Sequence, residues 1–108
     1  MYQIFLSGHF AREIKGFVKK HPNILAEIGV ALSAFDKASA TSLGANTYKM
    51  RIGSKSAGHG KSGAFRMVIL LIEVDSIIAP LAFYAKADRA NISRQEILYH
   101  IEMVKREL

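Results

Sequence analysis

The feature that most constrains the fold is a change in the spacing of apolar residues along the chain. Over residues 10–35 they recur every three or four positions, which predicts two helices, one ending near His21 and the next beginning at Pro22. From Thr47 they alternate with polar residues, as in a half-buried strand. Two more strands are predicted, one at residues 64–74 and one at residues 77–86. The second is bulged or lies at an edge, because Pro80 cannot donate a ladder hydrogen bond.

A third helix is predicted after residue 92. Ser93 and Glu96 have the spacing of a capping box, in which each side chain accepts a hydrogen bond from the other residue's amide. The buried stripe of this helix is expected to comprise Ile97, Ile101, Val104 and Leu108.

A short strand at residues 2–6 and a turn-rich stretch at 39–46 complete the prediction. We therefore expect one α+β domain over residues 1–108: a small antiparallel sheet of three or four strands, two N-terminal helices and a C-terminal helix. The N-terminal helices should bury one face of the sheet. The other face should stay partly open and carry the chemistry.

The charges are distributed unevenly along the chain. The net charge is +6, and no acidic residue occurs between Asp36 and Glu73. A phosphate-facing wall explains such a segment better than chance clustering does, because a carboxylate there would repel the ligand. The basic residues of this segment are Lys37, Lys49, Arg51, Lys55, Lys61 and Arg66, together with His59.

A basic chain of this kind has nucleic acid or an anionic membrane as its expected partner. The apolar run from Met67 to Ile72 is far shorter than the roughly 20 residues that span a bilayer. The N-terminal residues lack the features of a signal peptide, so we expect a cytoplasmic protein. The absence of cysteine excludes disulfides, thiol nucleophiles and thiolate zinc sites.

Other kinds of site find little support. The HGKSG run differs from a phosphate-binding P-loop, because Lys55 stands where the first glycine is needed and a strand follows instead of a helix. The four histidines are scattered along the sequence, so we expect no metal site and no cofactor. Glu73 and Asp75 are too isolated to form a catalytic carboxylate pair.

The remaining candidate is a group of cations on the predicted strands. Lys49 and Arg51 share a strand face by alternation, and Arg66 opens the next strand. Tyr84 and Lys86 share a face at the end of the last strand. A lone strand arginine is usually a solvated cation, but several cations meeting a tyrosine indicate a site for a phosphate.

These residues lie in a segment, strongest over residues 47–96, that resembles the RelE-like toxins of the HigB group. The shared pattern is a Lys-x-Arg strand, a Gly-Lys-Ser-Gly loop with a downstream arginine, an aromatic-Ala-Lys segment and an Asn-Ile-x-x-x-Glu helix start. The matching residues are Lys49, Arg51, Gly60, Lys61, Ser62, Gly63, Arg66, Tyr84, Ala85, Lys86, Asn91, Ile92 and Glu96. The chain departs from the pattern at Pro80, and at Ala64, where many relatives have a second glycine.

The resemblance implies a microbial-ribonuclease-like fold and an endoribonuclease (mRNA interferase) that cleaves messenger RNA, in many members on the ribosome. It also implies neutralisation by a cognate antitoxin, often of the helix-turn-helix type. An alternative is a non-catalytic toxin or nucleic-acid-binding module acting on another target such as DNA gyrase.

For the cleavage reaction we expect the RNA 2′-hydroxyl to be the nucleophile. Arg51, Lys61 and Arg66 would hold the phosphate, and Tyr84 would orient or deprotonate the hydroxyl or stack on a base. Lys86 would stabilise the transition state or serve as acid, with His59 as an alternative base. Further RNA contacts are expected from Lys49, Lys55, His59, Ser62 and Arg89.

Overall fold

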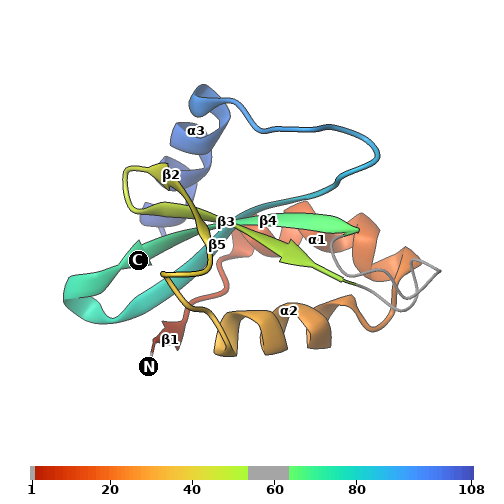
Figure 1. Ribbon diagram of the computed structural model, residues 1–108, viewed down its shortest axis with the longest axis horizontal. Coiled ribbons are helices and arrows are strands. Elements are labelled where there is room, and N and C mark those ends of the chain that lie inside the picture. Colours follow the sequence, from red (N-terminus) through yellow and green to blue (C-terminus); the bar gives the residue numbers. More distant parts are fainter. Residues whose placement is uncertain (1, 54–63) are drawn as a thin grey trace.

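A five-stranded mixed sheet runs through the middle of the computed structural model, which describes residues 2–53 and 64–108 (Figure 1). The order across the sheet is β1-β5-β4-β3-β2, with β1 parallel to β5 and the other pairs antiparallel. The strands are β1 (Gln3–Ile4), β2 (Thr41–Gly44), β3 (Thr47–Ile52), β4 (Phe65–Ile72) and β5 (Ile77–Ala85). The helices are α1 (Gly8–Lys20), α2 (Ile24–Ser33) and α3 (Arg94–Lys105). The expected α+β fold, with two N-terminal helices and a C-terminal helix, is confirmed. The expected sheet of three or four antiparallel strands is corrected to five strands in the described residues, because β2 is added at one edge and β1 pairs in parallel at the other.

Each helix begins where its local sequence provides a cap or a turn. The Ser7 hydroxyl accepts a hydrogen bond from the Phe10 amide at the start of α1, and the predicted capping box of Ser93 and Glu96 is present at the start of α3. The second helix begins at Ile24, two residues later than expected from Pro22. No helix within the described residues is long and apolar enough to cross a membrane.

One strand was missed by the sequence analysis. Residues 41–44, expected as part of a turn, form β2 and pair with β3. The hairpin between them is tight, because Gly44, Ala45 and Asn46 all have positive φ angles. Turn-forming residues dominate this segment, so its sequence gives no alternating pattern, and it becomes a strand by pairing with the edge of β3.

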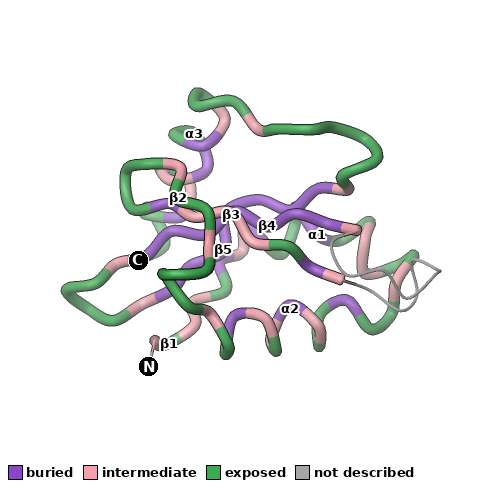
Figure 2. The backbone as a smooth tube through the Cα atoms, viewed as in Figure 1, coloured by how far each residue is buried: buried purple, intermediate pink, exposed green. Residues whose placement is uncertain are grey.

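The two faces of the sheet carry separate hydrophobic clusters, and β4 alternates between them. Phe65, Met67, Ile69 and Leu71 pack under α1 and α2, on what we call the helix-pair face. Val68 and Leu70 lie on the opposite face with Ile101 and Val104 of α3, and we call this the α3 face. Figure 2 shows the buried backbone of β4 and β5 between these layers.

The α3 face was predicted to be partly open. It is covered in part by α3. The expected stripe of α3 is correct for Ile97, Ile101 and Val104. It is wrong for Leu108, which lies beyond the helix and is 51% exposed.

A bulge in β5 determines which side chains reach the α3 face. The register shifts between Val68 and Ile69, so that Ile69 opposes Pro80, Val68 opposes Ala82, and Leu81 is the extra residue. Leu81 and Ala82 consequently both pack on the α3 face although they are adjacent. Alternation then resumes, which places Phe83 on the helix-pair face and Tyr84 on the α3 face.

Pro80 fits the bulge for a physical reason. Strand β1 pairs with only Ile77 and Ile78, so the outer edge of β5 is unpaired by the time the chain reaches Pro80. The missing N–H of proline therefore costs no ladder hydrogen bond to β1. Among the described residues β5 is bulged next to Pro80 and unpaired on its outer edge there, so both predicted alternatives are confirmed.

The capping box of α3 gives the first prediction. Replacing Ser93→Ala removes the acceptor for the Glu96 amide and should lower the free energy of unfolding by about 1 kcal/mol. Urea unfolding monitored by circular dichroism measures this change. Ser33→Ala, at the exposed end of α2, is the control and should change stability by less than about 0.5 kcal/mol. An equal effect of both substitutions would contradict the role given to the cap.

Candidate active site

Three predicted site residues lie side by side across the sheet. Arg51 on β3 is the register partner of Arg66 on β4, and Arg66 is the register partner of Tyr84 on β5. Directly opposed residues of antiparallel strands project from the same face. We call these residues the Arg51–Arg66–Tyr84 row. The row lies on the α3 face, where Tyr84 packs with the α3 cluster.

The row runs from solvent into the fold. Arg51 is exposed, whereas Arg66 is only 8% exposed and Tyr84 only 6%. One terminal nitrogen of Arg66 donates to the Phe65 carbonyl at 3.2 Å, which helps to fix the guanidinium. A planar cation held in place in the middle of the row is well suited to bind a phosphate, because little side-chain freedom is lost on binding.

Arg89 closes the inner end of the row. Its guanidinium carbon lies 5.4 Å from the centre of the Tyr84 ring. Its two terminal nitrogens donate to the Glu96 carboxylate at 2.7 and 3.0 Å, and its Nε donates to the Asn91 carbonyl at 3.0 Å. Because Glu96 also belongs to the capping box, the start of α3 sets the position of Arg89.

The same contacts explain the acidity of Glu96. The hydrogen bonds from Arg89 lower its pKa to about 2, and those from Ser93 act in the same direction. The carboxylate is therefore ionised at neutral pH and holds Arg89 through two charge-assisted hydrogen bonds.

The Tyr84 hydroxyl is buried and, among the described residues, has no hydrogen-bond partner. Burial raises the pKa of this phenol, against the opposing influence of the Arg66 and Arg89 charges. The phenol is therefore protonated at neutral pH. A buried hydroxyl without a partner costs roughly 1–3 kcal/mol, so this atom indicates a site adapted to a ligand.

The other predicted residues are placed as follows. Lys49 lies two positions before Arg51 on the same face, opposite Val68. Lys86 is exposed just past β5, and its amide donates to the Ala64 carbonyl at 3.1 Å. The predicted residues Lys55, His59, Lys61 and Ser62 lie outside the described residues.

A hollow of about 240 Å³ lies beside the outer end of the row. It is lined by Lys49, Met50 and Arg51 of β3 and by residues 34–36 and 39–41, which lead from α2 into β2 and include the acidic Asp36. In the register given, β2 pairs with β3 only as far as Lys49, so the β3 edge from Met50 onward faces this hollow.

The structure also assembles residues that the sequence analysis treated as scattered. His9 and Glu13 on α1 lie beside His100 on α3, and both histidines are buried. The i,i+4 spacing of His9 and Glu13 was a local signal for one half of this group. The contact with His100, 91 residues away from His9, has no local signal.

Comparison with known proteins identifies the family. The family model described as "RelE toxin of RelE / RelB toxin-antitoxin system" matches residues 2–107. The chain belongs to the RelE toxin family. It is thus the toxin of a type II toxin–antitoxin system, and toxins of this family are generally endoribonucleases. The family also implies a RelB-type antitoxin as partner.

A solved structure supports the fold independently. The chain is similar to a double arginine-to-alanine mutant of E. coli toxin RelE in the free state, with a TM-score of 0.54 and 10% sequence identity. The match covers 95% of this chain and 97% of the other. At this identity the likeness shows the RelE fold alone. No curated protein sequence matches the chain.

The buried hydroxyl of Tyr84 gives a prediction about stability. Tyr84→Phe removes a buried hydroxyl that has no partner among the described residues, so the free energy of unfolding should rise by roughly 1 kcal/mol. Thermal and urea unfolding measure the change. Tyr99→Phe, at a tyrosine that is 54% exposed, is the control and should have little effect. A clear loss of stability in Tyr84→Phe would show that the hydroxyl has a partner.

The Arg89–Glu96 pair gives a prediction about pH. In Arg89→Gln the pKa of Glu96 should rise from about 2 toward its ordinary value near 4.5, because the largest cause of the lowering is removed. A depressed carboxyl pKa adds stability above the ordinary pKa, and this stability is lost as the pH falls toward 2. Between about pH 4.5 and pH 2, the free energy of unfolding should therefore fall less in the variant than in the wild type. Carboxyl-carbon NMR reports the pKa, with Arg106→Gln as the control.

Proposed function

We propose that the chain is a metal-independent endoribonuclease that cleaves messenger RNA on the ribosome and thereby inhibits translation. The observation that carries this proposal is the Arg51–Arg66–Tyr84 row, in which two cations share one face with a buried phenol that has no hydrogen-bond partner in residues 2–53 and 64–108. Family membership supports it, since RelE toxins are generally endoribonucleases.

The proposed reaction uses the nucleophile that RNA itself provides. The 2′-oxygen attacks the adjacent phosphorus while the bond from phosphorus to the 5′-oxygen breaks. The 2′-hydroxyl gives up its proton, and the leaving 5′-oxygen takes one. Negative charge grows on the phosphate oxygens, so fixed cations beside them lower the barrier.

Arg66 is the principal phosphate ligand in this proposal, because it is the cation held in place within the row. Arg51, at the exposed end of the row, would attract the phosphate and neutralise part of its negative charge. Two arginines on adjacent strands can contact different phosphate oxygens at the same time.

Tyr84 acts in this proposal as a hydrogen-bond donor. Its raised pKa keeps the phenol protonated, which suits donation to the 2′-oxygen or to a phosphate oxygen better than proton abstraction. Its small exposure also favours this role over stacking on a base. Lys86, exposed next to the end of β5, would stabilise the transition state or protonate the leaving oxygen.

RNA binding beyond the scissile phosphate is assigned to Lys49 and to the loop residues Lys55, His59, Lys61 and Ser62. Lys61 is also a proposed phosphate ligand, and His59 an alternative base. These loop assignments rest on the sequence pattern alone. Arg89 is engaged with Glu96, so its contribution to RNA binding would be secondary to holding the Tyr84 ring.

The remaining parts of the proposal concern the cell. A cytoplasmic location follows from a messenger-RNA substrate. Neutralisation is assigned to a cognate antitoxin, with a helix-turn-helix protein as the expected type. Lys49 and Arg51 on β3 would attract both RNA and an acidic part of that antitoxin.

Arginine substitutions test the catalytic row. Arg66→Ala should reduce RNA cleavage by roughly 100-fold or more, because it removes fixed charge from the transition state. The readouts are growth arrest after induction without antitoxin and the rate of transcript cleavage. Circular dichroism checks that the variant folds. Arg51→Ala, at an exposed position, tests the same row with less risk to the core.

Arg106→Ala is the matched control, since Arg106 is an exposed arginine at the end of α3 that pairs with Glu102. It should cleave at nearly the wild-type rate. Full growth arrest by Arg66→Ala at equal protein level would refute the assigned role. Codon-phased 5′ ends would support cleavage on the ribosome. DNA damage with intact transcripts would instead indicate a gyrase-like target.

The chemistry of the cut ends tests the choice of nucleophile. Attack by the 2′-oxygen should leave a cyclic phosphate or a 3′-phosphate on the upstream fragment and a 5′-hydroxyl on the downstream fragment. If water attacked the phosphorus and the bond to the 3′-oxygen broke, the ends would be a 3′-hydroxyl and a 5′-phosphate. Mass spectrometry of the products distinguishes the two outcomes. A 2′-deoxy residue at the cleavage position should prevent the cut, whereas one placed two nucleotides away should not.

A further inference from the structure

We propose that His9, Glu13 and His100 form a binding site for one zinc ion at the contact between α1 and α3. We call these three residues the α1–α3 histidine site. The site is separate from the Arg51–Arg66–Tyr84 row, and this inference does not depend on the proposed ribonuclease activity.

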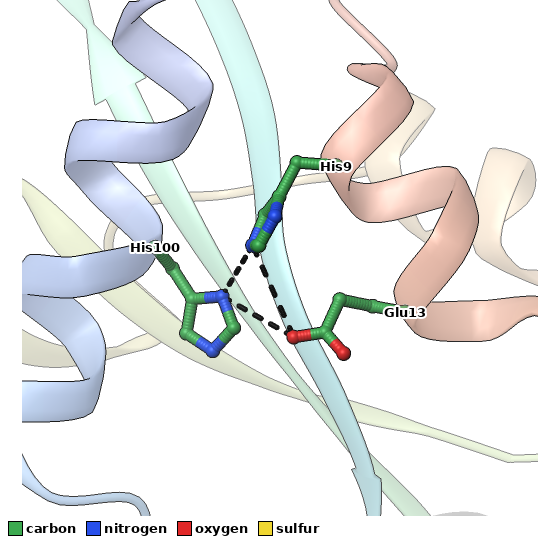
Figure 3. Close-up of side chains that lie close together, drawn as sticks. All are labelled: His9, Glu13 and His100. Atoms are coloured by element: carbon green, nitrogen blue, oxygen red, sulfur yellow. Dashed lines mark hydrogen bonds and ion pairs between the residues drawn. The ribbon is translucent and has the colours of Figure 1, made fainter.

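Three potential ligand atoms face one another across the two helices (Figure 3). The His9 Nε2 lies 2.7 Å from the His100 Nδ1. The Glu13 Oε1 lies 3.4 Å from the His100 Nδ1 and 3.9 Å from the His9 Nε2. All three atoms fall within 4.8 Å of one another, so a single ion can reach them together.

These distances come close to those of a tetrahedral zinc site. Zinc binds histidine nitrogen and carboxylate oxygen at about 2.0–2.2 Å, which places neighbouring ligand atoms about 3.3 Å apart. The distance from Glu13 to His100, 3.4 Å, is near this value, and the distance from Glu13 to His9, 3.9 Å, is about 0.6 Å longer. The nitrogen–nitrogen distance is about 0.6 Å shorter because, without an ion, one ring nitrogen donates a hydrogen bond to the other. To hold the ion, the two rings would separate and the Glu13 carboxylate would approach His9, each by about 0.6 Å.

The local sequence supplies two of the ligands and the tertiary fold supplies the third. Glu13 is one turn after His9 on α1, so their side chains lie on the same side of the helix. His100 occupies the buried stripe of α3 between Ile97 and Val104. A protein that buries an imidazole pair must satisfy its nitrogens, and a metal ion does this as well as a shared proton.

The surroundings of the three side chains also suit a metal. The Glu13 side chain is 40% exposed, so it can adjust its position and water can supply a fourth ligand beside it. The ring of Tyr99 packs edge-on against both histidines.

The ligand set selects the class of metal. Two imidazoles and one carboxylate favour zinc over magnesium or calcium, which prefer oxygen ligands. The chain has no cysteine, so no thiolate competes for the ion. Two histidines and a glutamate are also the protein ligands of one class of zinc site.

A zinc ion at this position would link two helices that lie far apart in sequence. It would also fix α3 one turn after Glu96, the residue that holds Arg89 against Tyr84. The expected role is therefore to stabilise the contact between α1 and α3. No catalytic step is assigned to the ion.

Zinc binding to the wild-type protein is the first test. The protein, freed of metal by a chelator and dialysed, is titrated with zinc chloride against a chromophoric competitor. We expect one ion per chain with a Kd on the order of 1 µM. At zinc about a hundredfold above this Kd the unfolding midpoint should rise by about 10 °C. No binding at tens of times that concentration would overturn the proposal.

Substitutions locate the ion. His100→Gln and Glu13→Gln should each weaken zinc binding by roughly 100-fold, since even residues that only support a ligand contribute about 10–100-fold. Glu27→Gln, a carboxylate on α2, is the control and should bind as the wild type does. Unchanged affinity in both site variants would contradict the assignment.

A spectroscopic measurement covers the case in which a variant fails to fold. The ring nitrogens of His9 and His100 in the wild type should shift on zinc addition in histidine NMR spectra. If only His21 and His59 respond, the ion binds elsewhere and the proposal is wrong. Because none of these readouts measures RNA cleavage, they can fail or succeed independently of the proposed function.

Discussion

One extra residue in β5 determines the chemistry of the α3 face. Without the bulge, strict alternation from Ile78 through Leu81 would place Phe83 under α3 and would turn Tyr84 toward α1 and α2. The extra residue reverses this order over the last part of the strand. Phe83 then packs against Phe17 and Phe65 in the larger cluster, while Tyr84 lies opposite Arg66. The same bulge thus completes the core on one side of the sheet and the candidate site on the other.

The start of α3 links stability to the candidate site. Glu96 accepts from the Ser93 amide as part of the capping box, and its carboxylate also accepts from both terminal nitrogens of Arg89. A helix cap of this kind contributes to stability in many proteins. Here it also orients a guanidinium against the ring of Tyr84, so a disturbance at the N-terminus of α3 would reach the inner end of the row.

The sequence was sufficient for those features that depend on local patterns. Alternation placed Lys49 and Arg51 on one face of β3, and the capping box was readable from its spacing. β2 was missed because its residues are those of a turn, and its pairing with β3 is a tertiary effect. The sequence grouped Tyr84 with the cations, but it did not locate the bulge that brings Tyr84 to their face, since Pro80 allowed either a bulge or an edge strand. The meeting of His9 with His100 and of Arg89 with Tyr84 depends on helix packing, which a single sequence does not reveal.

The layout of the sheet has a consequence for the order of folding. Strands β3, β4 and β5 are neighbours in sequence and pair as successive hairpins, whereas Gln3 must find Ile77 and His9 must find His100. Loop-closure entropy delays contacts of such large sequence separation. We therefore expect the central meander to assemble before the N-terminal segment and α3 dock on it. The arginines of the row would then come together early, and the phenol beside them would lose contact with water only in the last stage of folding.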